Sequence, residues 1–172
     1  MNKSFKGEYI SFALRLAKRM VPVILILIFA LFKIYYGRAF SEDLASYRTY
    51  FLIFMIICFL IGIYFHTDKI RTVVNEIKIS DNHLIVIGQD FNSKFEDKLN
   101  IEKVMIEIQE EELGKNKTRY CLEIYSEDKY YYLNKFNDWK YSTLAEIVDE
   151  YKLKTGKVIS GMDLYSNLNL SN

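Results

Sequence analysis

Residues 20–32, MVPVILILIFALF, and residues 50–65, YFLIFMIICFLIGIYF, are the two uninterrupted apolar runs of this chain, and neither contains an acidic residue. With the flanking residues 33–36 and 47–49, each run approaches the roughly 17–25 residues that a helix needs to cross about 30 Å of hydrocarbon. A helix also satisfies its own backbone hydrogen bonds, which lipid cannot do. The runs therefore predict a membrane hairpin of two helices over 20–66. A pair of buried core helices is the alternative, but such helices normally keep a polar face.

Basic residues flank both runs on the sides away from the segment that connects them. Five basic residues precede the first run and two follow the second, whereas the connecting segment 37–49 carries two basic and two acidic residues. The positive-inside bias predicts a multi-pass protein of the bacterial inner membrane with both termini in the cytoplasm. Its expected partners are the lipid bilayer and other copies of the chain, through self-association of the membrane helices.

The N-terminal segment 1–19 has its own apolar pattern, with Phe5, Tyr9, Phe12 and Leu16 at helical spacing. Basic and polar residues fill most of its other positions. One prediction is a basic amphipathic helix on the cytoplasmic leaflet, where each Lys or Arg gains about 1 kcal/mol from anionic lipid. The equal alternative is a cytoplasmic continuation of the first membrane helix.

From residue 67 onward the chain alternates polar and apolar residues over short stretches separated by turn signals such as Asp81-Asn82. The expected strands are 73–79, 84–87, 94–98, 101–109, 118–125 and 129–133. A helix is expected from Asn137 or Asp138, either of which can cap it, through Leu153, with Gly156 ending it. We therefore expect a small antiparallel β-barrel with one closing α-helix over 67–157. A tail, 158–172, follows, with a candidate added strand at 157–159.

Composition and motifs argue against several classes of function. The net charge of +1 over 172 residues gives no general attraction for DNA. The glycine patterns of nucleotide-binding loops and the common hydrolase and metalloprotease motifs do not occur. The two cysteines and two histidines lack zinc-ligand spacing. We expect no catalysis, no bound metal and no cofactor.

The stretch 94–151, KFEDKLNIEKVMIEIQEEELGKNKTRYCLEIYSEDKYYYLNKFNDWKYSTLAEIVDEY, resembles the later half of bacterial pleckstrin-homology-like (PH-like) domains. In those domains an I-x-x-V strand start leads to a long hairpin, a short l-x-i-y-s-x-d hairpin and a closing helix. Many of them, including the YcxB-like proteins, also carry two N-terminal membrane helices. The layout is similar to that of the CBASS two-transmembrane β-barrel effectors of antiphage defence. That resemblance implies a barrel that senses a cyclic oligonucleotide and a membrane part that disrupts the inner membrane.

Aromatic and basic residues gather on the last predicted strands, and the candidate ligand-binding residues are Arg119, Tyr125, Lys129 and Tyr132. Nucleobases stack on aromatic faces for about 1–3 kcal/mol each, and arginine binds phosphate through a bidentate fork. Tyrosines that simply form strands and pack are the alternative. Three functions stay open: a membrane-anchored sensor-effector that binds a cyclic oligonucleotide, a non-catalytic scaffold that binds a protein or lipid headgroup, and an immunity protein against a membrane-acting toxin.

Overall fold

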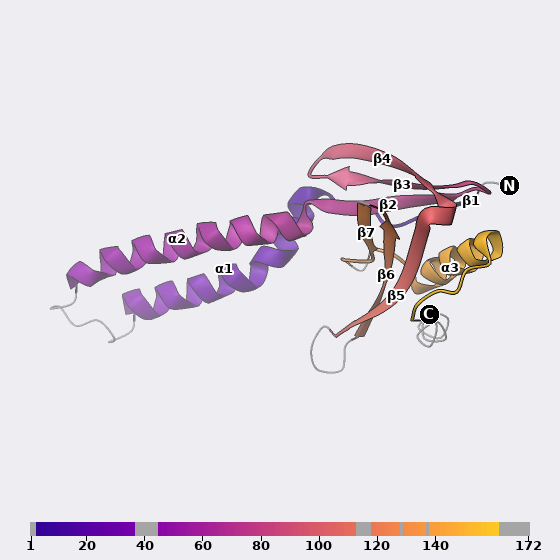
Figure 1. The fold of residues 1–172 in the computed structure, drawn as a ribbon. Helices are drawn as coiled ribbons and strands as arrows, with labels where there is room; N and C mark the ends of the chain where they lie inside the picture. Colours follow the sequence, from indigo (N-terminus) through magenta and orange to yellow (C-terminus); the bar gives the residue numbers. More distant parts are fainter. Residues whose placement is uncertain (1–2, 37–44, 113–117, 128, 137, 162–172) are drawn as a thin grey trace. The chain divides into compact units, whose positions relative to one another are not determined.

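The computed structural model describes residues 3–36, 45–112, 118–127, 129–136 and 138–161 (Figure 1). The chain divides into two compact units. The β unit combines Met1–Ile10 with Thr72–Asn172, and the helical unit is Ser11–Arg71. The β unit is therefore discontinuous in sequence, because the helical unit is inserted after its first strand. This division differs from the expected one, in which residues 1–19 and 67–157 formed separate parts.

The helical unit consists of α1 (Phe12–Tyr36) and α2 (Ala45–Ile70). Within α2, Thr49–Thr67 is long and apolar enough to cross a membrane, with a mean hydropathy of 2.2, and among the described residues it is the one such segment. The uncharged part of α1 lies between Arg19 and Lys33 and covers only about 20 Å at 1.5 Å per residue, short of the hydrocarbon thickness. The prediction of two membrane helices is therefore wrong, and the multi-pass topology loses its support.

The first strand, β1 (Lys3–Lys6), lies where the sequence predicted the start of an amphipathic helix. It pairs antiparallel with β2 (Thr72–Ile79), and Phe5 faces Ile77 across the pair. Phe5 is buried in the core of the β unit, and the Lys3 ammonium lies 2.7 Å from the Glu150 carboxylate. Pairing with a strand some seventy residues away outweighs the helical spacing of this short segment. Helix α1 begins only at Phe12.

The strands that the structure describes form two antiparallel sheets. The first has the order β1-β2-β3-β4, with β3 at His83–Asp90 and β4 at Ser93–Asn100. The second has the order β5-β6-β7, formed by Val104–Glu112, Thr118–Ser126 and Lys129–Leu133. The six expected strands and their antiparallel pairing are confirmed, with small shifts at their ends.

The expected closed barrel is wrong, because both sheets are open and no hydrogen-bonded ladder joins them among the described strands. A 3₁₀ turn, Ile101–Lys103, separates β4 from β5 and takes the place of the first three residues of the expected strand 101–109. The Asn100 side chain caps this turn by accepting from the Glu102 backbone N–H at 3.1 Å. The turn redirects the chain, so that the strands of the second sheet run across those of the first (Figure 1).

Helix α3 (Tyr141–Thr155) packs its apolar side chains, including Leu144, Ile147 and Val148, into the core between the sheets. Gly156 ends it in the left-handed region at φ 65°, as expected. The cap differs from the prediction: Lys140 holds the N-cap position, whereas Asp138 accepts from the Phe136 backbone N–H, and Asn137 lies outside the described residues. The expected strand at 157–159 is a single parallel bridge between Ser160 and Glu107 of β5.

Candidate functional site

The four predicted ligand-binding residues lie on the second sheet but do not form one site. Strand alternation and register put Arg119 and Tyr125 of β6 on the same face as Tyr132 of β7. Lys129 lies on the opposite face, where its ammonium pairs with the Asp97 carboxylate of β4. The structure therefore brings Arg119 and Tyr132 together and separates Lys129 from both.

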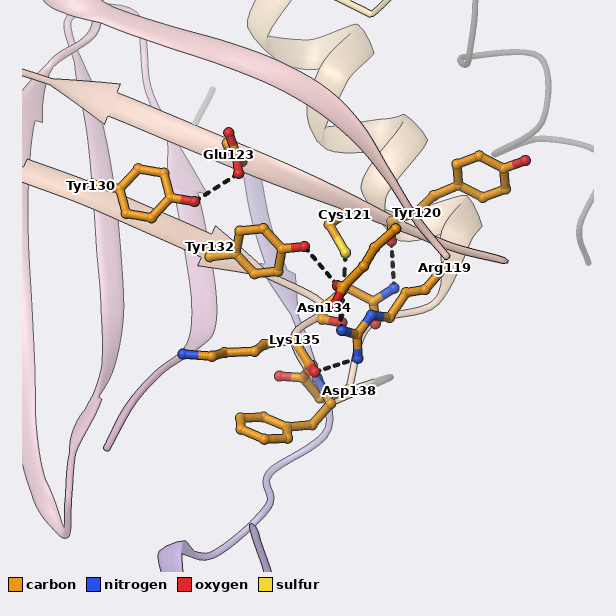
Figure 2. Close-up of polar contacts among 11 residues, drawn as sticks. Arg119, Tyr120, Cys121, Glu123, Tyr130, Tyr132, Asn134, Lys135 and Asp138 are labelled. Carbon is orange, nitrogen blue, oxygen red and sulfur yellow. Dashed lines mark hydrogen bonds and ion pairs between the residues drawn. The ribbon is translucent and has the colours of Figure 1, made fainter. Parts of the chain in front are cut away.

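Arg119 is buried, with 5% of its surface exposed, and each terminal nitrogen of its guanidinium has a partner, whereas its Nε has none among the described residues (Figure 2). One nitrogen lies 2.5 Å from the Glu111 carboxylate, and the other donates to the Lys135 backbone carbonyl. The Tyr132 hydroxyl donates to the same Glu111 carboxylate at 3.0 Å. Burial, together with contacts to Cys121 and Glu111, raises the pKa of Tyr132, which stays a neutral donor. The cluster ties strand β5 to β6 and β7, so the arginine fork is not open to a phosphate.

Tyr125 belongs to a second cluster on the same face. Its ring centroid lies 5.1 Å from that of Tyr130, and both hydroxyls donate to the Glu123 carboxylate. The hydrogen bond to Glu123 raises the pKa of Tyr125 to about 12. By register this face also carries Glu107 and Glu111, so its acidic residues outnumber Arg119 and the local field opposes an anionic ligand. The ligand-binding role assigned to these residues stays a prediction.

A different part of the β unit has the character of a binding site. A groove of about 500 Å³ lies where β1 ends and β2 to β4 meet, and its lining includes Lys6, Tyr9, Asn75, Glu76, Gln89 and Lys94. We call it the polar groove. Pockets that hold small ligands commonly measure about 300–1,000 Å³. The polar groove is therefore large enough for a metabolite or a lipid headgroup.

Two local irregularities shape the polar groove. The pairing of β2 with β3 shifts between Val74 and Glu76, which makes Asn75 the extra residue of a β-bulge. The Asn75 carbonyl instead accepts from the Gly7 backbone N–H at 2.9 Å. At Gly88 a Cβ atom would lie 2.3 Å from the Val73 carbonyl oxygen, so only glycine fits. Bulges and strand glycines often mark functional positions.

The polar groove contains hydrogen-bonding groups without partners. Gln89 is 6% exposed, and neither its Oε1 atom nor Oδ1 of Asn75 has a hydrogen-bond partner among the described residues. Lys94 of β4 is the cross-strand neighbour of Gln89. Lys6 of β1 is the cross-strand neighbour of Glu76. The residues that line the groove therefore include two whose side-chain oxygens are covered and unpaired among the described residues, and two that carry ammonium groups. The sequence analysis missed it, although Gly88 inside a strand was a usable signal.

The described residues contain no group of three or more His, Cys, Asp or Glu side chains placed to hold a metal ion. Comparison with known proteins adds no assignment, because no protein family, curated protein or solved structure matches this chain. The resemblance to PH-like domains and to the CBASS effectors therefore remains a prediction from the sequence. The polar groove rests on geometry alone.

Proposed function

We propose that this protein is a membrane-attached, non-catalytic sensor in which the helical unit contacts the bilayer and the β unit binds a small polar ligand. The single observation that carries the proposal is the buried Gln89 side-chain carbonyl, which has no partner in the described part of the chain, beside a groove lined by lysines. An unpaired buried acceptor costs about 1–3 kcal/mol. A ligand that donates to it recovers that cost, whereas a purely structural groove gains nothing from it.

Membrane attachment is supported by the surface of the helical unit. Thr49–Thr67 has the length and hydropathy of a span. Large apolar side chains are exposed on both helices, among them Leu25, Ile28, Phe29, Phe32, Phe54, Ile57 and Leu60. Soluble monomers rarely expose contiguous apolar patches of this kind. Lipid covers such a surface, and self-association of the helices covers the part that lipid does not reach.

Coupling between ligand and membrane is supported by the path of the chain. Lys6, Gly7 and Tyr9 line the polar groove, and α1 begins three residues after Tyr9. Asn75 and Glu76 line it as well, and α2 ends at Ile70. A ligand in the groove therefore contacts Tyr9, which lies three residues before α1, and strand β2, which begins two residues after α2 ends. Occupancy of the groove changes the order of these segments, which is how the sensor signals to the membrane.

Alkaline carbonate extraction of membranes tests the attachment. The wild-type chain should stay in the membrane pellet. Ile57→Arg puts a charge at the middle of the α2 segment at a cost of about 2.5–3.5 kcal/mol and should release the protein. His66→Arg is the matched control, because an arginine near the end of the segment reaches the interface and should leave the protein in the pellet. Extraction of the wild-type chain would refute membrane attachment.

The ligand and the response need a second experiment. The cyclic oligonucleotide expected from the sequence remains a prediction, and a thermal-shift screen of the full chain with cyclic di- and trinucleotides tests it. If the protein is also an effector that disrupts membranes, a ligand that shifts the melting temperature should release dye from liposomes that carry the protein. Binding without dye release would favour a scaffold that docks at the membrane.

A further inference from the structure

We propose that the polar groove binds a phosphate ester that also carries hydroxyl or amine donors, such as the headgroup of a phospholipid or a free phosphorylated metabolite. This inference names the ligand of the sensor proposed above and rests on that function only for its biological meaning. It is argued from the acceptors, the cations and the size of the groove.

The unpaired acceptors determine which hydrogen-bonding groups the ligand must carry. Within the described ranges of the chain, the Oε1 atom of Gln89 is buried without a partner, and so is Oδ1 of Asn75 on the neighbouring strand. Carbonyl oxygens of this kind accept hydrogen bonds and do not donate them. The ligand must therefore present N–H or O–H groups to this wall of the groove. An anion without donors leaves both oxygens unpaired.

The two lysines determine which charged group the ligand must carry. Lys6 of β1 and Lys94 of β4 line the groove from different strands, and among the described residues neither forms an ion pair. Lysine binds phosphate as a point charge, and a phosphate has oxygens enough for two ammonium groups. Because Lys94 and Gln89 are cross-strand neighbours, with Cβ atoms about 5 Å apart, one small molecule can reach both.

The acidic residue in the lining does not oppose this assignment. Glu76 accepts a hydrogen bond from the Ser4 hydroxyl at 2.7 Å and lies 3.6 Å from the Lys78 ammonium. The Ser4 bond and the nearby lysines lower the pKa of Glu76, so it stays ionised. Its charge is offset by both Lys78 and Lys6, and the charged side chains of the lining, Lys6, Lys94 and Glu76, still carry one net positive charge.

Isothermal titration of the full chain in phosphatidylcholine nanodiscs tests the proposal with four probes. Glycerol 3-phosphate and phosphoethanolamine carry phosphate and donors, methyl phosphate carries phosphate alone, and glycerol carries donors alone. The first two should bind roughly tenfold more tightly than methyl phosphate, as expected for one or two added hydrogen bonds. Glycerol should show no binding. Equal affinity for every phosphate probe, or no binding of any, would overturn the proposal.

Three variants assign the site. Gln89→Met should weaken glycerol 3-phosphate to the affinity of methyl phosphate and leave methyl phosphate unchanged, a pattern that a merely misfolded groove cannot give. Lys94→Gln should weaken both phosphates. Lys98→Gln removes the same charge from an exposed position of β4 outside the groove and should change neither. An unchanged affinity of glycerol 3-phosphate in Gln89→Met would refute the assignment.

Lipid composition distinguishes the two sources of the ligand. If the headgroup of phosphatidylglycerol occupies the groove, nanodiscs that contain this lipid should weaken glycerol 3-phosphate by competition. If the ligand is a free metabolite, the affinity should be the same in both kinds of disc. Carbonate extraction reads membrane attachment separately. If the chain binds glycerol 3-phosphate but is extracted from the membrane, this inference stands and the proposed function is refuted.

Discussion

Truncation of Arg119 to alanine should destabilise the β unit, because this arginine ties β6 to β5 and to the segment that follows β7. The change removes the 2.5 Å contact with Glu111 and the donor to the Lys135 carbonyl. Breaking a fully buried ion pair costs about 3–5 kcal/mol. Glu111 is 41% exposed and can turn to water after the change, so the expected loss of stability is smaller, about 2–3 kcal/mol. Most of this loss comes from the hydrogen bonds that Arg119 no longer makes.

The assay is denaturant unfolding followed by the fluorescence of Trp139. This is the single tryptophan of the chain, and it is 5% exposed in the core of the β unit. Lys129→Ala is the matched control, because it removes the same charge from a half-exposed side chain paired with Asp97 and should cost less than about 1 kcal/mol. Equal losses in the two variants, or a loss below about 0.5 kcal/mol for Arg119→Ala, would refute a tie between the strands.

Three further predictions concern Gly7, strand β1 and the tyrosines of the β unit. Gly7→Ala puts a Cβ atom 2.6 Å from the Trp139 ring, so it should lower the free energy of unfolding by about 1–3 kcal/mol. It should also shift Trp139 emission to longer wavelength, and unchanged emission would show that the ring is not displaced. A chain that starts at Thr72 loses β1 and buried Phe5, and it should unfold at lower denaturant concentration than a chain in which residues 3–10 are joined to Thr72 by a flexible linker. The pKa of Tyr125 is raised to about 12 by its bond to Glu123, above the usual value of about 10, so its contribution to stability should be complete below pH 10 and be lost as the pH rises through 12. Absorbance at 295 nm should show tyrosine ionisation returning toward pH 10 in Glu123→Gln, and an unchanged titration curve would contradict this cause.

Alternation predicted the strands of the β unit because each strand carries its own signal, such as Val104, Ile106 and Ile108 facing the core. It could not predict β1, whose four residues take their conformation from a partner some seventy positions away. It could not separate the two sheets either, because the 3₁₀ turn at Ile101–Lys103 has no glycine or proline to mark it. The first membrane helix was over-predicted by extending an apolar run across Lys33.

The candidate site was harder to predict because residue type does not reveal which partner a side chain already has. Arg119 has the chemistry of a phosphate ligand, yet the hairpin register places Glu111 directly opposite it. The expected strand ended at residue 109, so Glu111 lay outside the expected pair, whereas β5 extends through Glu112. The polar groove depends instead on a bulge at Asn75 and on the approach of residues 6–9, and neither follows from local pattern.

The insertion of the helical unit between β1 and β2 gives this strand pair a particular mechanical geometry. Both links to the helices leave the pair at the same end, next to Lys6 and Glu76. Tension between the helices therefore unzips the pair, loading its hydrogen bonds one after another, whereas tension from opposite ends would load all of them at once. A ligand that bridges the polar groove spans the point where unzipping starts. In single-molecule pulling, handles at Ile10 and Thr72 should open the β unit at a lower force than handles at Lys3 and Thr72.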